Sequence, residues 1–268
     1  MPVREILVHL DSPEVVGALI PAAAKLARDL HAPALTLAAL AEIPVRMSAA
    51  PLPFGMLKAR ENALLDRLDR METRARDAAP GIQIEWRGAV SPAAQTLLAR
   101  WGVRADLVIM SHRGDGSAAM APVDVGAAVL AAGRPVLVVP REAPELRFER
   151  VLIGFKSTRE ARAALAAAVP LLDRARRVLI ASVGPAPAND LRDAATFLHG
   201  HGVRAETAVI DDVADGDAAD ALLALAGEEQ PDLLVTGAWG HSRARELVFG
   251  GVTRTLLDDG RLACLMVH

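Results

Sequence analysis

The sequence repeats the same order of segments twice. An apolar run at residues 6–10 (ILVHL) is followed by an alanine-rich segment, and residues 151–155 (VLIGF) begin the same order again. Three later pairs of apolar runs also correspond: 34–40 with 178–183, 105–110 with 231–236, and 134–139 with 261–267. Repetition of a long unit indicates tandem copies of one fold. We predict domains at residues 1–140 and 151–268, joined by a charged, proline-containing linker at 140–150.

The spacing of the apolar runs predicts an α/β fold. Short apolar runs alternate with helical stretches of ten or more residues, a pattern typical of parallel strands joined by right-handed crossovers, with helices on both faces. Runs such as 106–110 and 136–139 are almost continuously apolar, as in strands buried on both sides. We therefore predict two tandem doubly wound parallel sheets of about five strands each.

The first copy carries an additional segment. The offset between equivalent residues is 145 at Asp11 and Lys156 but 126 at Asp106 and Asp232, a difference of 19 residues. We place most of these in residues 42–57, where three prolines predict a loop.

A surface helix is predicted after this loop, at residues 58–79. Its apolar residues recur every three or four positions, and charges of both signs occupy the other faces. The apolar set is Leu64, Leu65, Leu68, Met71 and Ala75.

Composition excludes several classes of partner and site. The formal net charge is −3, with 30 basic and 33 acidic residues, which argues against a nucleic-acid partner or an anionic membrane surface. The single cysteine, Cys264, excludes an internal disulfide, and we expect it to be a small core residue. No uncharged apolar run approaches the roughly 20 residues of a membrane helix, and the first residues do not resemble a signal peptide. We therefore expect a cytoplasmic protein.

A glycine-rich segment follows the apolar run at 233–236. Two residues separate Gly237 from Gly240, nine more separate Gly240 from Gly250, and Gly251 follows directly. Glycine brings bare N–H groups close to a bound anion, and the N-terminus of a following helix favours negative charge at the same point. The pattern predicts a phosphate site. An alternative is that the glycines only allow close packing of a helix on the sheet.

With Val252 and Thr253 after the last glycine pair, this segment resembles the nucleotide-binding signature of the universal stress protein family. In that signature, the glycines at these spacings are followed by Ser or Thr. Gly251 departs from it, since a hydroxyl residue usually stands there, although Thr253 could supply one contact. The resemblance implies a non-catalytic stress-response protein that binds ATP, with Mg²⁺, or a related adenine nucleotide.

The resemblance also implies how the two copies associate. Domains of this family pair through their last strands, so residues 136–139 and 264–267 are expected to pair antiparallel within one chain, as a pseudo-dimer. Such pairing would bury two sheet edges. A further homodimer of the whole chain is left open.

The family's binding features are divided between the two copies. The first copy keeps Asp11, where binding members place an aspartate against adenosine, but has Asp124 where a phosphate-facing glycine is expected. A carboxylate there would repel phosphate, so we expect no triphosphate in the first copy. The second copy keeps the glycines but has Lys156 in place of the aspartate. The predicted binding residues are Gly154, Lys156, Gly237, Gly240, His241, Gly250, Gly251, Val252 and Thr253.

Several alternatives are left open at this stage. The polar residues His241, Ser242, Arg243 and Arg245 either contact phosphate or form the first turn of a helix with Ser242 as its N-cap. The sequence contains no Gly-x-Ser-x-Gly or His-Glu-x-x-His motif and no evident acid/base pair, so we predict that the chain is not an enzyme. The competing functions are a protein-interaction scaffold that binds no nucleotide and a slow ATPase, which would lack an evident general base.

Overall fold

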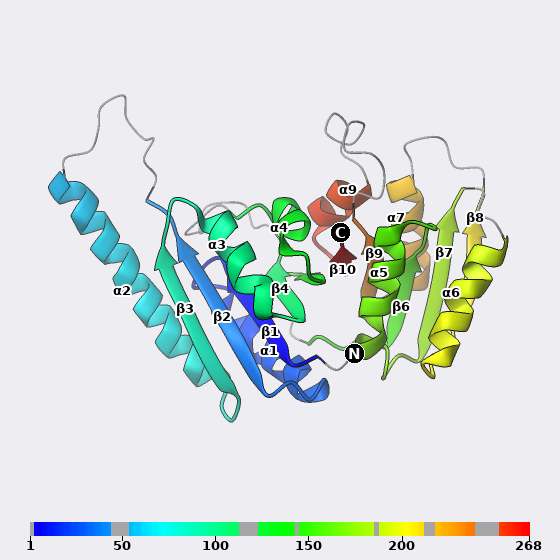
Figure 1. The fold of residues 1–268 in the computed structure, drawn as a ribbon, viewed down its shortest axis with the longest axis horizontal. Coiled ribbons are helices and arrows are strands. Elements are labelled where there is room, and N and C mark those ends of the chain that lie inside the picture. The colour runs from blue at the N-terminus through cyan, green and yellow to red at the C-terminus, as the bar shows by residue number, and fades with distance from the viewer. Residues whose placement is uncertain are drawn as a thin grey trace. The chain divides into compact units, whose positions relative to one another are not determined.

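A computed structural model describes residues 3–43, 54–112, 123–142, 145–184, 188–211, 218–238 and 252–268. It has the α/β fold predicted from the sequence (Figure 1). Internal contacts divide the chain into two units. The N-terminal unit comprises Val3–Ala132 and Arg141–Leu146, and the C-terminal unit comprises Gly133–Pro140 and Arg147–His268. The domain limits 1–140 and 151–268 stay a prediction.

The N-terminal unit is a parallel sheet with strand order β3-β2-β1-β4. Ile6 of β1 lies opposite Leu35 of β2 on one side and Leu107 of β4 on the other. Helices α1 and α2 pack together, as do α3 and α4, so both faces of the sheet are covered (Figure 1). The elements are β1 (Glu5–Leu10), α1 (Val16–Asp29), β2 (Ala34–Ala41), α2 (Phe54–Ala78), β3 (Gln83–Val90), α3 (Ala94–Trp101), η1 (Gly102–Arg104), β4 (Leu107–Ser111) and α4 (Val125–Ala132).

The C-terminal unit has strand order β5-β10-β9-β6-β7-β8. Strands β6 to β10 are parallel, and β5 pairs antiparallel with β10, with Leu137 opposite Leu265. This confirms the predicted antiparallel pairing of the last strands. The elements are β5 (Val136–Val139), β6 (Arg150–Gly154), α5 (Arg159–Ala168), η2 (Val169–Leu171), β7 (Arg177–Val183), α6 (Ala188–Gly200), β8 (Glu206–Ile210), α7 (Ala218–Glu229), β9 (Leu233–Gly237), α9 (Val252–Asp259) and β10 (Ala263–Val267).

Burial explains which strands the sequence reveals. Every residue of β4, β5 and β10 is buried, as expected for apolar strands covered on both faces. By contrast, β3, which begins the first strand order, and β8, which ends the second, contain no buried residue. They mix polar and apolar residues and lack a continuous apolar run.

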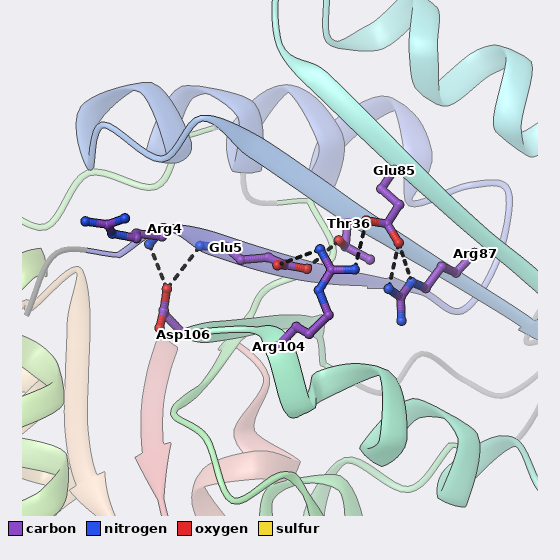
Figure 2. A network of polar contacts seen from close by, with 7 residues as sticks. All are labelled: Arg4, Glu5, Thr36, Glu85, Arg87, Arg104 and Asp106. Carbon is purple, nitrogen blue, oxygen red and sulfur yellow. Dashed lines mark hydrogen bonds and ion pairs between the residues drawn. The ribbon is translucent and has the colours of Figure 1, made fainter.

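One aspartate contact occurs in both units and supports the internal repeat. The Asp106 carboxylate accepts hydrogen bonds from the backbone N–H groups of Arg4 and Glu5, at 2.7 and 3.1 Å (Figure 2). Asp232, its equivalent, accepts from the N–H groups of Glu149 and Arg150, at 2.8 and 3.1 Å. In each unit the contact ties the start of the first strand to the residue before the fourth.

A polar network extends from this contact across the N-terminal unit. Arg104 forms ion pairs with Glu5 at 3.3 Å and Glu85 at 3.4 Å, and Glu85 accepts a hydrogen bond of 2.6 Å from Arg87 (Figure 2). The hydrogen bond from Arg87 lowers the pKa of Glu85. The network links β1 and β3 across β2, where Thr36 donates to Glu5 at 2.9 Å.

Helix α2 differs from its prediction at two places. It begins at Phe54, so the last four residues of the predicted 42–57 loop are helical, directly after the final proline. Leu68, Met71 and Ala75 are buried as predicted, but Leu65 is 42% exposed, so the apolar stripe is narrower than expected. Residues 44–53 lie outside the described part.

None of the helices in the described part of the chain is both long and apolar enough to span a membrane.

Candidate functional site

Two of the predicted binding residues, Gly154 and Gly237, lie at the ends of neighbouring strands. Gly154 ends β6 and pairs with Thr236 of β9, and Gly237 ends β9. Strands β7 and β8 lie beyond β6, whereas β10 lies beyond β9, so the winding reverses between these two strand ends. Ligands of open α/β sheets bind at such a switch point. Lys156 is exposed two residues beyond the end of β6.

Gly237 has a structural role that is independent of any ligand. A Cβ atom at this position would lie 2.5 Å from the backbone nitrogen of Ala161 and 2.7 Å from the carbonyl carbon of Glu160. Both atoms belong to the first turn of α5, so only glycine allows this helix to pack so closely on β9. This contact supports the packing interpretation of the glycines for Gly237.

Gly154 is less restricted. A Cβ atom there would lie 2.9 Å from Cδ2 of Leu222, the far end of a flexible side chain.

The N-terminus of α5 is capped by the protein's own side chains. Thr158 is the N-cap and accepts a hydrogen bond from the N–H of Ala161 at 3.2 Å. Glu160 lies in the first turn with its side chain only 12% exposed, and hydrogen bonding from its own backbone N–H lowers its pKa. A carboxylate therefore already occupies the positive end of this helix. An anionic ligand would have to use other amide groups.

The glycine segment is described only at its two ends. Gly240, His241, Gly250 and Gly251 lie outside the described residues, as do Ser242, Arg243 and Arg245. After the segment, Val252 begins α9, and Thr253 in its first turn is buried. The helix expected after the last glycine pair is therefore present.

His268 is a residue of this site that the sequence did not suggest. Its Nδ1 lies 3.1 Å from the carbonyl oxygen of Ala238, which directly follows β9. The N–H of Ala238 donates to Val267 at 2.8 Å. His268 and Ala238 are 30 residues apart, so no local motif connects them. The sequence indicates a role for His268 at this site only through its position, directly after the last strand.

In the N-terminal unit, the corresponding strand ends carry charged and polar side chains. Nη1 of Arg141 donates to Oδ2 of Asp11 at 2.5 Å, and Nη2 donates to Oγ of Ser12 at 3.0 Å. Nη1 also makes a long contact of 3.5 Å to the carbonyl oxygen of His112, directly after β4. Asp11 is 17% exposed in this pair. The aspartate expected to face adenosine is thus bound to an arginine of the same chain.

Asp124 also acts on its own chain. Its Oδ1 accepts a hydrogen bond of 2.7 Å from the N–H of Ala127, in the first turn of α4. Its own N–H donates to Oε1 of Gln95 at 3.1 Å. The carboxylate therefore occupies the N-terminus of this helix, and the absence of triphosphate from the first copy stays a prediction.

His9 fills the position that Gly154 holds in the second copy. Its imidazole is buried, and its Nε2 has no hydrogen-bond partner among the described residues. Burial lowers its pKa to about 4, against a smaller opposing effect of the Asp11 charge. The ring is therefore neutral at neutral pH. The described residues contain no cluster of three or more His, Cys, Asp or Glu that could hold a metal ion.

Comparison with known proteins gives a match to a family model over residues 147–268 and a shared fold for the whole chain. Residues 147–268 match the model of the universal stress protein family. No curated protein matches the chain.

Two solved structures resemble the chain along its full length. A universal stress protein from Archaeoglobus fulgidus is 13% identical, with a TM-score of 0.73, and the match covers 98% of this chain and 95% of that one. A functionally unknown protein from Pseudomonas aeruginosa is 18% identical, with a TM-score of 0.60 and coverage of 99% and 92%. At these identities the likeness shows a shared fold.

Proposed function

We propose that the chain is a cytoplasmic, non-catalytic stress-response protein, because residues 147–268 match the model of the universal stress protein family and the whole chain shares its fold with a universal stress protein. Its second copy binds an adenine nucleotide, with ATP and Mg²⁺ as the expected ligand. The first copy binds none.

The contrast between the two switch points carries this proposal. The C-terminal unit has Gly154 and Gly237 at its adjacent strand ends, and neither adds a side chain there. The N-terminal unit has His9 and Ser111 at the equivalent positions, with the Arg141–Asp11 ion pair directly beyond them. In the N-terminal unit, side chains of the chain itself occupy the switch point, so an anionic ligand would have to displace the Arg141–Asp11 ion pair to bind there.

The remaining binding residues have complementary roles in the proposal. Lys156 supplies an exposed cation for phosphate oxygens, as a compact point charge. Thr253 supplies a hydroxyl in the first turn of α9, compensating for Gly251. Mg²⁺ would arrive coordinated by the phosphate groups, as it commonly does, so it needs few carboxylates from the protein.

Calorimetric titration of the full chain with ATP and Mg²⁺ tests the proposal. We expect binding by the wild-type chain, loss of binding in a Gly240→Asp variant, and unchanged binding in Gly114→Asp. Gly114 is the first-copy equivalent of Gly240, so it is the matched control for adding a carboxylate. Absence of wild-type binding at millimolar ATP, or equal effects of the two substitutions, contradicts the proposal.

The packing of Gly237 favours a second candidate, a protein-interaction scaffold that binds no nucleotide. Contact with Ala161 explains this glycine without a ligand. The same titration decides between the two, since a scaffold gives no heat with ATP.

An ATPase would in addition release phosphate from ATP. We expect the wild-type chain to release phosphate no faster than a Gly250→Asp variant.

A further inference from the structure

The residues that follow the two last strands are equivalent. Gly133 and Gly260 precede β5 and β10 at an offset of 127, and both have positive φ, 56° and 66°. At the same offset Leu137 corresponds to Cys264 and Val138 to Leu265. Val138 pairs with Cys264 and Leu137 with Leu265, so the two strands pair about a local two-fold axis. Arg141 therefore corresponds to His268, one residue beyond the predicted end of the first copy.

Both residues make the same contact. Arg141 directs Nη1 to the carbonyl of His112, and His268 directs Nδ1 to the carbonyl of Ala238, at 3.5 and 3.1 Å. His112 and Ala238 are themselves equivalent, since each directly follows the fourth strand of its copy. Different side chains thus place a nitrogen on the same backbone group in both copies.

The two side chains differ in their further hydrogen-bond partners. Arg141 also donates to Asp11 and Ser12, so it connects the ends of the first and fourth strands. In the second copy Lys156 replaces Asp11, so an arginine at position 268 would meet a like charge. The histidine keeps the contact to the carbonyl.

We propose that His268 is a positioning residue of the nucleotide site. Because a carbonyl oxygen only accepts, Nδ1 must carry the proton of this hydrogen bond. With the Ala238 N–H bound to Val267, the contact holds both polar backbone groups of Ala238. Ala238 directly follows β9, beside the switch point between Gly154 and Gly237, so His268 fixes the first residue beyond that strand. This inference rests on the proposed function.

Two variants of His268 distinguish the effect of losing the hydrogen bond from the effect of losing the imidazole ring. His268→Leu removes the donor, whereas His268→Asn keeps an N–H near the position of Nδ1. In calorimetric titration with ATP and Mg²⁺, we expect the Kd to rise about fivefold in His268→Leu, the value of one ordinary hydrogen bond, and to stay within about twofold in His268→Asn. Arg141→Leu removes the equivalent contact of the first copy and should leave the Kd unchanged. Thermal melting verifies that each variant is folded.

A second readout does not depend on nucleotide. Without ligand, hydrogen exchange at the Ala238 amide should be about fivefold faster in His268→Leu than in the wild type, and near the wild-type rate in His268→Asn. Wild-type ATP binding that is equally strong in His268→Leu overturns the inference and leaves the proposed function intact. Absence of wild-type binding overturns the proposed function. In that case the exchange rate of the Ala238 amide alone tests the contact between His268 and Ala238. Faster exchange in His268→Leu supports the contact, and an unchanged rate overturns it.

Discussion

His9 shows how a single buried side chain makes this fold sensitive to acid. Its imidazole has a pKa of about 4 in the folded chain, compared with 6.5 in the absence of burial. Between these values the unfolded chain binds a proton that the folded chain does not, so folding stability falls as the pH decreases. From pH 7 to pH 4 this one group should lower the free energy of unfolding by about 3 kcal/mol.

Substitution of His9 tests this effect. Urea unfolding of His9→Leu at pH 7, 5.5 and 4 should show a pH dependence shallower than that of the wild type by about 3 kcal/mol over the range. Equal pH profiles for His9→Leu and the wild type would show that the imidazole titrates normally.

At the residue level, the sequence located the strand-end positions correctly but not the contacts made there. Asp11 and Lys156 follow the first strands, as predicted, because the apolar runs define where those strands end. The pairing of Asp11 with Arg141 spans 130 residues, and that of His268 with Ala238 spans 30. Neither residue type is unusual after a strand, so only the folded chain reveals these partners. Gly240, His241, Gly250 and Gly251 stay predictions.

Among the elements, the close approach of α5 to β9 depends on Gly237. In Gly237→Ala the new Cβ would overlap backbone atoms of Ala161 and Glu160, which cannot rotate away as a side chain can. Helix α5 would have to shift, and we expect a loss of at least about 2 kcal/mol in the free energy of unfolding.

Gly17→Ala is the matched control, because Gly17 lies inside α1 with no atom within 4 Å of the added Cβ. Alanine should stabilise that helix by about 0.5–1 kcal/mol. Urea denaturation of both variants measures the two effects. A Gly237→Ala variant as stable as the wild type would mean that α5 does not pack against β9 as described.

The elements predicted well from sequence are those with a simple burial pattern. Continuous apolar runs identified β4, β5 and β10 because both faces of these strands are covered. Strands β3 and β8 could not be identified in this way, since they carry exposed polar residues and lack a continuous apolar run. The start of α2 was misplaced because the prolines of 42–57 suggested a loop beyond Pro53.

For the molecule as a whole, the repeat explains both what the two copies share and how they differ. They share the aspartate contact at Asp106 and Asp232, the positive-φ glycine before the last strand, and the contact to the residue after the fourth strand. They differ at the switch point, where one copy has Arg141, Asp11 and Asp124 and the other has glycines. The sequence alone shows that Asp11 and Asp124 stand where the second copy has Lys156 and Gly250, because the duplication allows the two copies to be compared position by position, but it does not show that Arg141 binds Asp11. Whether the whole chain forms a homodimer stays open.

The most direct measurement is a crystal structure of the full chain grown with ATP and Mg²⁺ at millimolar excess. The account predicts nucleotide density beside Gly237 and Thr253 of the C-terminal unit, and none beside Asp11 and Asp124. Nucleotide bound beside Asp11, or side chains that fill the space next to Gly237 with no nucleotide present, would contradict it.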